Sequence, residues 1–147
     1  MTATGHAVIG TVIAAKIGNP ALAIPIAIAS HIAADYFPHW DPATNAAQKG
    51  IKRVFREGMF DVALGFVISY LIITFLFPTT NLLYAFAIII AAQSFDWLMA
   101  PYYFFGVKQF KWAYKIGKAT NRELKEPWGI INQVIILALL VIFAKIF

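Results

Sequence analysis

The sequence predicts an all-α integral membrane protein, a single compact bundle of about five transmembrane helices with two amphipathic segments in the membrane interface. Of its 147 residues, 61% are apolar and 13% are charged, too few charges to cover the surface of a soluble domain of this size. The apolar residues stand in long blocks rather than in stripes on one helix face. With no cysteine, the chain can form neither a disulfide framework nor a thiolate metal site.

Two short helices are expected first, over residues 4–17 and 20–37. Between them, Asn19-Pro20 suits a helix N-cap followed by a proline in the first turn. Residues 43–57 mix basic and apolar side chains, which is typical of a helix lying in the membrane surface.

The second half of the chain repeats this hairpin arrangement. Residues 58–77 and 82–100 are long apolar blocks joined by an uncharged turn. Residues 102–126 are basic and aromatic, as expected at the level of the lipid headgroups, and residues 128–147 form the last helix.

The distribution of charge predicts the orientation of the chain. Ten of the twelve Lys and Arg residues lie in the two interfacial segments, and the turns at the opposite ends hold none. By the positive-inside rule both segments face the cytoplasm, so in the inner or plasma membrane the N-terminus is cytoplasmic and the C-terminus outside. We expect these segments to contact anionic lipids rather than nucleic acid, and the chain could form homo-oligomers.

All histidines and aspartates avoid the strongly basic stretches. Ionisable groups in or beside apolar helices cost several kcal/mol on most scales, which makes them functional candidates. The seven residues are His6, His31, His39, Asp35, Asp41, Asp61 and Asp96.

Helix geometry predicts that these residues share one layer. His6 is 13 residues before Asn19 in the first turn and His31 is 12 residues after it, so the two imidazoles are nearly level in antiparallel helices. Asp61 and Asp96 are likewise 18 residues before and 17 residues after the centre of the second turn. Both pairs are expected toward the cytoplasmic ends of their helices.

The pair His31 and Asp35 has the i,i+4 spacing that places two side chains on one helix face. A mixed set of imidazoles and carboxylates suits Zn²⁺, with Mn²⁺ or Fe as alternatives. The layer offers more groups than one ion requires, so two ions, or one ion and a general base, are both open.

Other interpretations of the layer remain open. Buried His and Asp side chains can simply bond neighbouring helices, Asp41 can cap a turn, and Asp61 can stabilise the first turn of its helix. The layer could also belong to a proton or ion pathway, as in a transporter or channel, or to a metal-stabilised structural module. The polar groups gather at one membrane face, which favours a site over a pathway.

Two motifs suggest a family. With Gly5-His6 and then His31-x-x-x-Asp35-x-x-Pro38-His39-Trp40-Asp41, the chain resembles small prokaryotic proteins described as predicted membrane-bound metal-dependent hydrolases. Some of these are likened to zinc-dependent phospholipase C or to LexA-regulated inner-membrane hydrolases. The resemblance covers the first 41 residues, and it implies a metal site and hydrolysis of an ester or phosphoester.

The resemblance assigns roles to the polar layer. It implies metal binding by His6, His31, Asp35 and His39. The catalytic candidates, as general base or as ligands of a second ion, are then Asp61, Asp96 and Asp41. The cations nearest in sequence, which could bind a substrate phosphate, are Lys52, Arg53 and Arg56.

Overall fold

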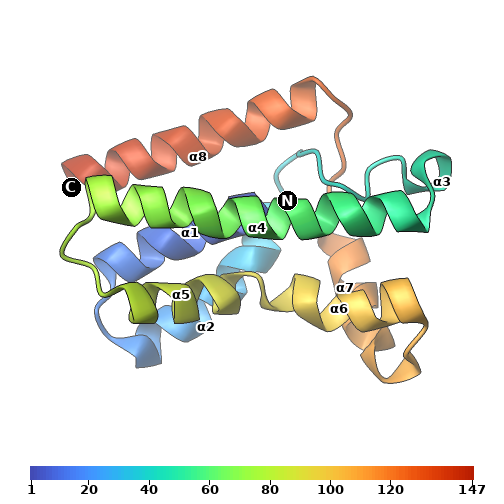
Figure 1. The fold of residues 1–147 in the computed structure, drawn as a ribbon, viewed down its shortest axis with the longest axis horizontal. Coiled ribbons are helices and arrows are strands. Elements are labelled where there is room, and N and C mark those ends of the chain that lie inside the picture. The colour runs from blue at the N-terminus through green and yellow to red at the C-terminus, as the bar shows by residue number, and fades with distance from the viewer.

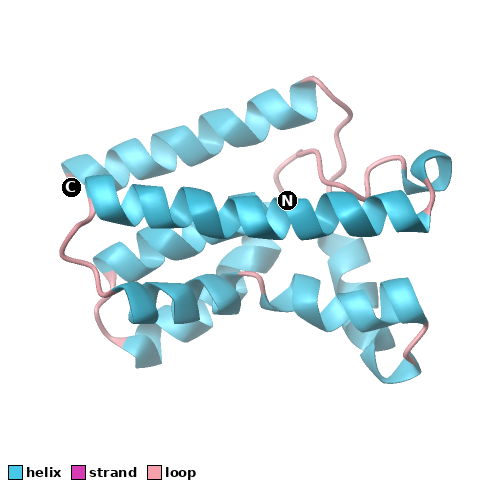
Figure 2. Ribbon diagram, in the orientation of Figure 1, coloured by secondary structure: helices cyan, strands magenta, loops and turns pink.

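A computed structural model describes all 147 residues, and every regular element in it is a helix (Figure 2). In chain order the helices are α1 Ala3–Lys16, α2 Pro20–Asp35, α3 Ala46–Lys49, α4 Ile51–Leu76, α5 Leu82–Ala92, α6 Ser94–Phe105, the 3₁₀ turn η1 Lys108–Phe110, α7 Lys111–Thr120 and α8 Trp128–Ile146. The all-α class predicted from the sequence is confirmed.

The centre of the fold is α1, which packs against α2, α4, α5 and α8. In Figure 1, α4 runs most of the length of the molecule at the front, with α8 above it, α1 behind it and α5 below one half of it, while α6 and α7 lie below the other half. Four helices can pack against α1 because several residues at these contacts have small side chains or none. A Cβ on Gly10 would lie 3.0 Å from the Cα of Ile89, and one on Gly65 would lie 3.1 Å from the Cα of Thr4. Small residues therefore let neighbouring helices approach backbone to backbone, as is common between membrane helices.

The two turns follow the sequence signals closely. Asn19 caps α2 by accepting a hydrogen bond from the amide of Ala21 at 2.9 Å, and Pro20 occupies the first turn. Asn81 caps α5 in the same way through the amide of Tyr84. Both turns lie at the same end of the molecule (Figure 1).

The first interfacial segment is shorter than expected. Residues 51–57, expected in a separate surface helix over 43–57, instead form the first turns of α4, and only α3 remains apart. The break comes at Gly50, whose φ of 77° is accessible to glycine but strained for other residues. Gly58 does not interrupt α4, because one glycine in a helix costs only about 1 kcal/mol and leaves the hydrogen bonds intact.

The fourth expected helix, residues 82–100, is bent. It divides at Gln93 into α5 and α6, which meet at an angle of 49°, and α6 continues through Pro101 to Phe105. By length and composition, α4 and α8 are able to cross a membrane, and the bent α5–α6 pair would be a third crossing. At 14 and 16 residues, α1 and α2 are shorter than a full crossing requires.

Candidate metal centre

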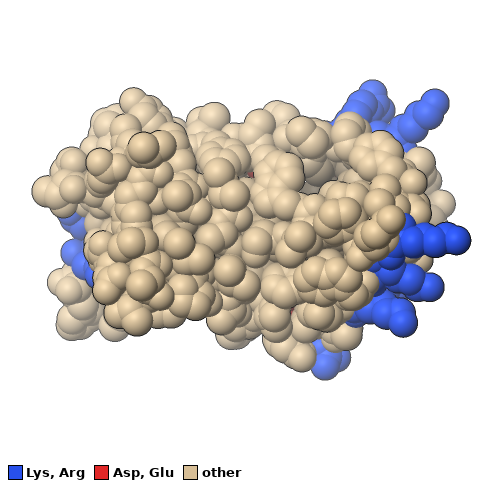
Figure 3. Space-filling model, turned by 90° about the horizontal axis from the view of Figure 1, so that it is seen from below, with Lys and Arg blue, Asp and Glu red and all other residues tan.

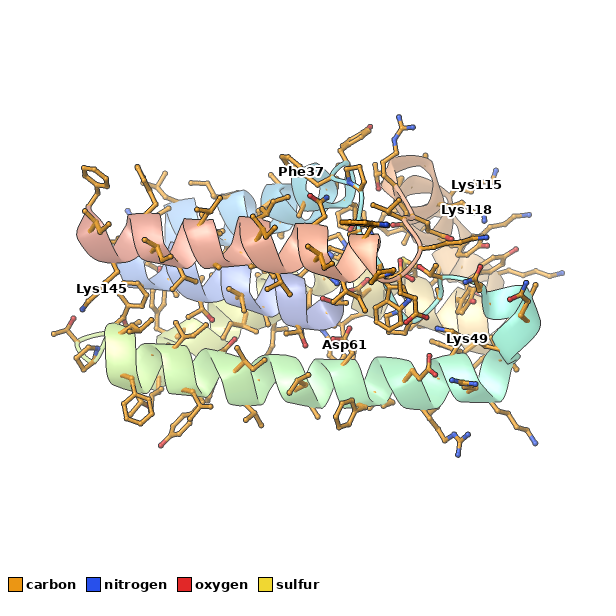
Figure 4. The ribbon with its side chains drawn as sticks, turned by 90° about the horizontal axis from the view of Figure 1, so that it is seen from above. Phe37, Lys49, Asp61, Lys115, Lys118 and Lys145 are labelled. Atoms are coloured by element: carbon orange, nitrogen blue, oxygen red, sulfur yellow. The ribbon has the colours of Figure 1, made fainter.

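A layer of buried polar groups lies halfway along the molecule, where several helix ends meet. The start of α1 supplies His6, the last turns of α2 supply His31 and Asp35, and the bend between α5 and α6 supplies Asp96. Asp61 comes from the middle of α4, and it lies beside the start of α1 in Figure 4. The level predicted from the two hairpins is therefore where these side chains meet.

The two imidazoles of this layer are stacked on one another. The ring centroids of His6 and His31 are 3.6 Å apart, the planes are 8° from parallel, and each residue is 1% exposed. Two imidazolium rings could not stack this closely without strong repulsion, so at least one ring is neutral and able to act as a ligand.

The tautomer of His31 is fixed by the helix bend. Its Nδ1 lies 2.8 Å from the carbonyl oxygen of Ala92, the last residue of α5. Since a carbonyl only accepts, Nδ1 carries the hydrogen, and in the neutral ring Nε2 presents a lone pair. This nitrogen is buried and has no hydrogen-bond partner.

Two carboxylates face that lone pair. Nε2 of His31 lies 3.5 Å from Oδ2 of Asp35 and 3.7 Å from Oδ1 of Asp96, and Nε2 of His6 lies 3.2 Å from Oδ1 of Asp35 without the alignment of a hydrogen bond. Lone pairs and carboxylates facing each other in a buried site repel unless a cation or a proton lies between them. The amino group of Met1 supplies one positive charge beside Asp35, but no Lys, Arg or amino group pairs with Asp96.

The separations have the dimensions of a metal site. A tetrahedral ion with ligand bonds of about 2.1 Å holds its ligand atoms about 3.4 Å apart. Ligand atoms of His6, His31 and Asp96 lie within 4.8 Å of one another, and Asp35 contacts both histidines. These residues could therefore hold one divalent ion after small side-chain movements.

Asp35 also receives the amino group of Met1, which lies against its Oδ1 in a buried contact. This contact ties the first residues to the end of α2 and was not expected from the sequence. No sequence signal pointed to it, because it depends on how α1 packs.

Asp61 anchors the start of α1. Its carboxylate accepts hydrogen bonds from the amides of Ala3 at 2.6 Å and Thr4 at 3.2 Å, and its carbonyl accepts one from the hydroxyl of Thr4. From the other side, Gln93 donates to the carbonyl of Ala3 at 2.9 Å. Asp61 and Gln93 thus fix the turn that carries His6, but neither belongs to the cluster of His6, His31 and Asp96.

His39 is held in a second polar cluster with Asp41. Its backbone pairs with residues 122–124, its Nδ1 bonds the carbonyl of Phe37 at 2.6 Å, and its Nε2 lies 3.6 Å from Oδ2 of Asp41. His39 is fully buried, but it is not among the residues within 4.8 Å of one another around His31.

Asp41 is bonded on several sides within the loop. It accepts hydrogen bonds from the amide of Thr44 at 2.8 Å and from the side chain of Asn121 at 3.0 Å. Burial alone raises the pKa of the Asp41 carboxyl, but bonding to His39 and Asn121 and the positive charge of the Met1 amino group bring that pKa below its usual value. This carboxyl therefore stays ionised and fixes the loop that carries His39.

The candidate phosphate-binding residues differ in whether their charge is already paired. Arg53 pairs with Glu57 at 2.7 Å, and Lys49 shares the same carboxylate at 2.9 Å. Lys52 and Arg56 are exposed and make no ion pair. Arg53 and Arg56 line a groove of about 440 Å³ that reaches Asp61, between α4 and the loop at Trp40 and Pro42.

Comparisons of the chain with protein-family models, with curated proteins and with solved structures find no match.

Proposed function

We propose that this chain is a membrane-embedded, metal-dependent hydrolase that acts on an ester or phosphoester of a lipid at the cytoplasmic membrane face. The observation that carries the proposal is the stacked His6–His31 pair, whose free Nε2 atoms face the carboxylates of Asp35 and Asp96.

The surface supports a membrane location. Large apolar side chains are exposed along α4 and α8, for example Phe75 at 74%, Leu139 at 61% and Phe143 at 62%. Figure 3 shows an uncharged surface between two ends, with most Lys and Arg gathered at one of them. A bilayer would cover the uncharged surface, and the end rich in Lys and Arg would lie in the cytoplasmic interface.

In this proposal five segments lie in the bilayer: α1, α2, α4, the α5–α6 pair and α8. Asp61 is the last charged residue of α4, and residues 62–76 extend about 22 Å beyond it. The polar layer would then lie near the cytoplasmic boundary of the hydrocarbon. At about 21 Å, α1 would reach from the outer turn to this layer, and its N-terminus would remain on the cytoplasmic side.

The residues present fit a hydrolytic centre. His6, His31 and Asp96 would bind the ion, Zn²⁺ or alternatively Mn²⁺ or Fe, and Asp35, whose carboxylate faces the same two Nε2 atoms, would be a fourth ligand. A bound divalent ion lowers the pKa of its water toward ~7 and so makes hydroxide available. The second oxygen of Asp96 is buried without a partner and could accept a proton from the attacking water.

The groove beside Asp61 would admit the substrate. It opens between α4 and the loop at Trp40, so a lipid headgroup could enter sideways while its acyl chains stay in the bilayer. Arg53 and Arg56 line this groove and would attract a phosphate.

Transport is less well supported. Beyond the polar layer, the space between α1, α2, α4 and α5 is filled by one apolar cluster: Ala14, Ala23, Ala27, Ile73, Ala85, Ile88 and Ala92. A proton or ion would need polar groups on that side to complete a pathway.

The test is elemental analysis of detergent-purified protein followed by assays on lipid phosphoesters and esters. We expect near-stoichiometric transition metal in the wild type and its loss, with activity, in His31→Ala and Asp96→Asn. Ser69→Ala is the matched control, because Ser69 is buried on α4 and its hydroxyl has no partner, but it is not one of the clustered residues.

Absence of metal from the wild type after incubation with Zn²⁺ and Mn²⁺ would refute the hydrolase proposal. Metal without turnover on any lipid ester would favour the structural module instead.

A further inference from the structure

A second groove lies at the basic end of the molecule, between the first turns of α4 and the end of α6. It has a volume of about 590 Å³, and we call it the aromatic groove. Its lining residues are Ile51, Lys52, Phe55, Arg56, Phe104 and Phe105. It lies apart from the metal centre and shares only Arg56 with the groove beside Asp61.

The walls of the aromatic groove are open apolar surface. Phe55 packs edge-on against Phe104, with ring centroids 5.1 Å apart, and against Phe105 at 6.3 Å. Phe105 nevertheless remains 72% exposed, Ile51 48% and Phe55 39%. Contiguous exposed apolar surface of this kind marks a site that another apolar group covers.

The charges beside these walls are unpaired. Glu57 is the acid within ion-pairing distance on this part of α4, and it is already shared by Lys49 and Arg53. Lys52 and Arg56 make no ion pair, and their i,i+4 spacing places them on one face of α4 beside the aromatic rings. An anion with an apolar chain would complement both features at once.

We propose that the aromatic groove binds one anionic phospholipid. Its phosphate lies between Lys52 and Arg56, and an acyl chain lies along Phe55, Phe104 and Phe105. The location agrees with this occupant, because the basic end of the molecule is where anionic headgroups would meet the protein. The lipid site requires no metal, so metal-free protein tests it apart from the hydrolase proposal, with whose groove it shares only Arg56.

The experiment is a titration of delipidated, chelator-treated protein in detergent with phosphatidylglycerol or phosphatidylcholine of identical chains. Native mass spectrometry counts the bound lipids and gives the affinity of the first one. We expect one tight phosphatidylglycerol per chain and much weaker phosphatidylcholine binding.

The decisive variant is the double substitution Lys52→Gln/Arg56→Gln, which should weaken the first phosphatidylglycerol by about 30-fold. The matched control is Lys115→Gln/Lys118→Gln, since both lysines are exposed on α7 at the same end of the molecule (Figure 4). It removes the same charge outside the groove and should change the affinity less than threefold. Phe105→Ala, which changes the aromatic groove but not the groove beside Asp61, should weaken phosphatidylglycerol binding and leave phosphatidylcholine binding weak.

Three results would overturn the proposal. Equal losses in the two double variants would mean diffuse attraction by the basic end. Equal affinities for the two lipids would mean apolar binding alone. Displacement of the lipid by millimolar inorganic phosphate would mean a site for a free phosphate rather than a lipid.

Discussion

The packing of α1 against α5 offers a test that separates steric strain from helix propensity. In Gly10→Ala the new methyl would lie 2.9 Å from the Cβ of Ala92 and 3.0 Å from the Cα of Ile89, well inside ordinary contact distance. In Gly58→Ala, on α4, the new methyl meets nothing within 4 Å. Both positions are helix interiors, so both gain about 1 kcal/mol of helix propensity on substitution.

The propensity gains cancel when the two variants are compared. The remaining difference is the overpacking at Gly10, for which about 1–3 kcal/mol is expected because its neighbours include the backbone of Ile88 and Ile89. We therefore expect Gly58→Ala to be about 1 kcal/mol more stable than wild type. Gly10→Ala should be about 1–3 kcal/mol less stable than Gly58→Ala, because of the overpacking. Unfolding in mixed micelles, followed by tryptophan fluorescence, measures both free energies.

The Gly10 substitution should also reach the metal centre. Ala92, which the new methyl displaces, supplies the carbonyl that fixes the ring of His31. Metal affinity should therefore fall in Gly10→Ala and stay unchanged in Gly58→Ala. Equal unfolding free energies in the two variants would refute the close approach of α1 and α5.

Three further predictions concern the polar residues. Asp61→Asn keeps one acceptor oxygen but loses the charge-assisted bonds to the amides of Ala3 and Thr4, so the free energy of unfolding should fall by about 1–3 kcal/mol; an unchanged value would show that α1 needs no such anchor. Asp41 has a lowered pKa in the folded state, so its stabilisation is present above the unfolded pKa of about 4 and is lost as pH falls through the folded pKa. The stability difference between wild type and Asp41→Asn should therefore shrink on acidification from pH 6 to pH 3, and a difference independent of pH would contradict this. Zn²⁺ should raise the thermal stability of wild type and a chelator should reverse the rise; an equal rise in His31→Ala would place the ion elsewhere.

The sequence carried local information well. The helix cap at Asn19 was readable because a short polar side chain before a proline in a helix's first turn favours capping. Counting residues from the two turns placed His6 level with His31 and Asp61 level with Asp96, since the rise of an α-helix is constant.

Depth along a helix says nothing about the direction in which a side chain points across the bundle. The stacking of His6 on His31, and the placement of Asp96 rather than His39 beside them, follow from the rotation of each helix and from the bend at Gln93. That bend frees the carbonyl of Ala92, which then fixes the tautomer of His31. The pairing of Asp61 with the amides of α1 likewise required two helices to meet.

The sequence by itself determined that the chain is helical and apolar, that most of its basic residues gather at one end, and that His6 is level with His31 and Asp61 with Asp96. These properties depend on composition and on constant helical rise. The tertiary structure decided which residues of the layer touch, which helices are long enough to cross a bilayer, and which cations remain unpaired. Those outcomes depend on contacts between segments far apart in the chain, where a small rotation of one helix exchanges one neighbour for another.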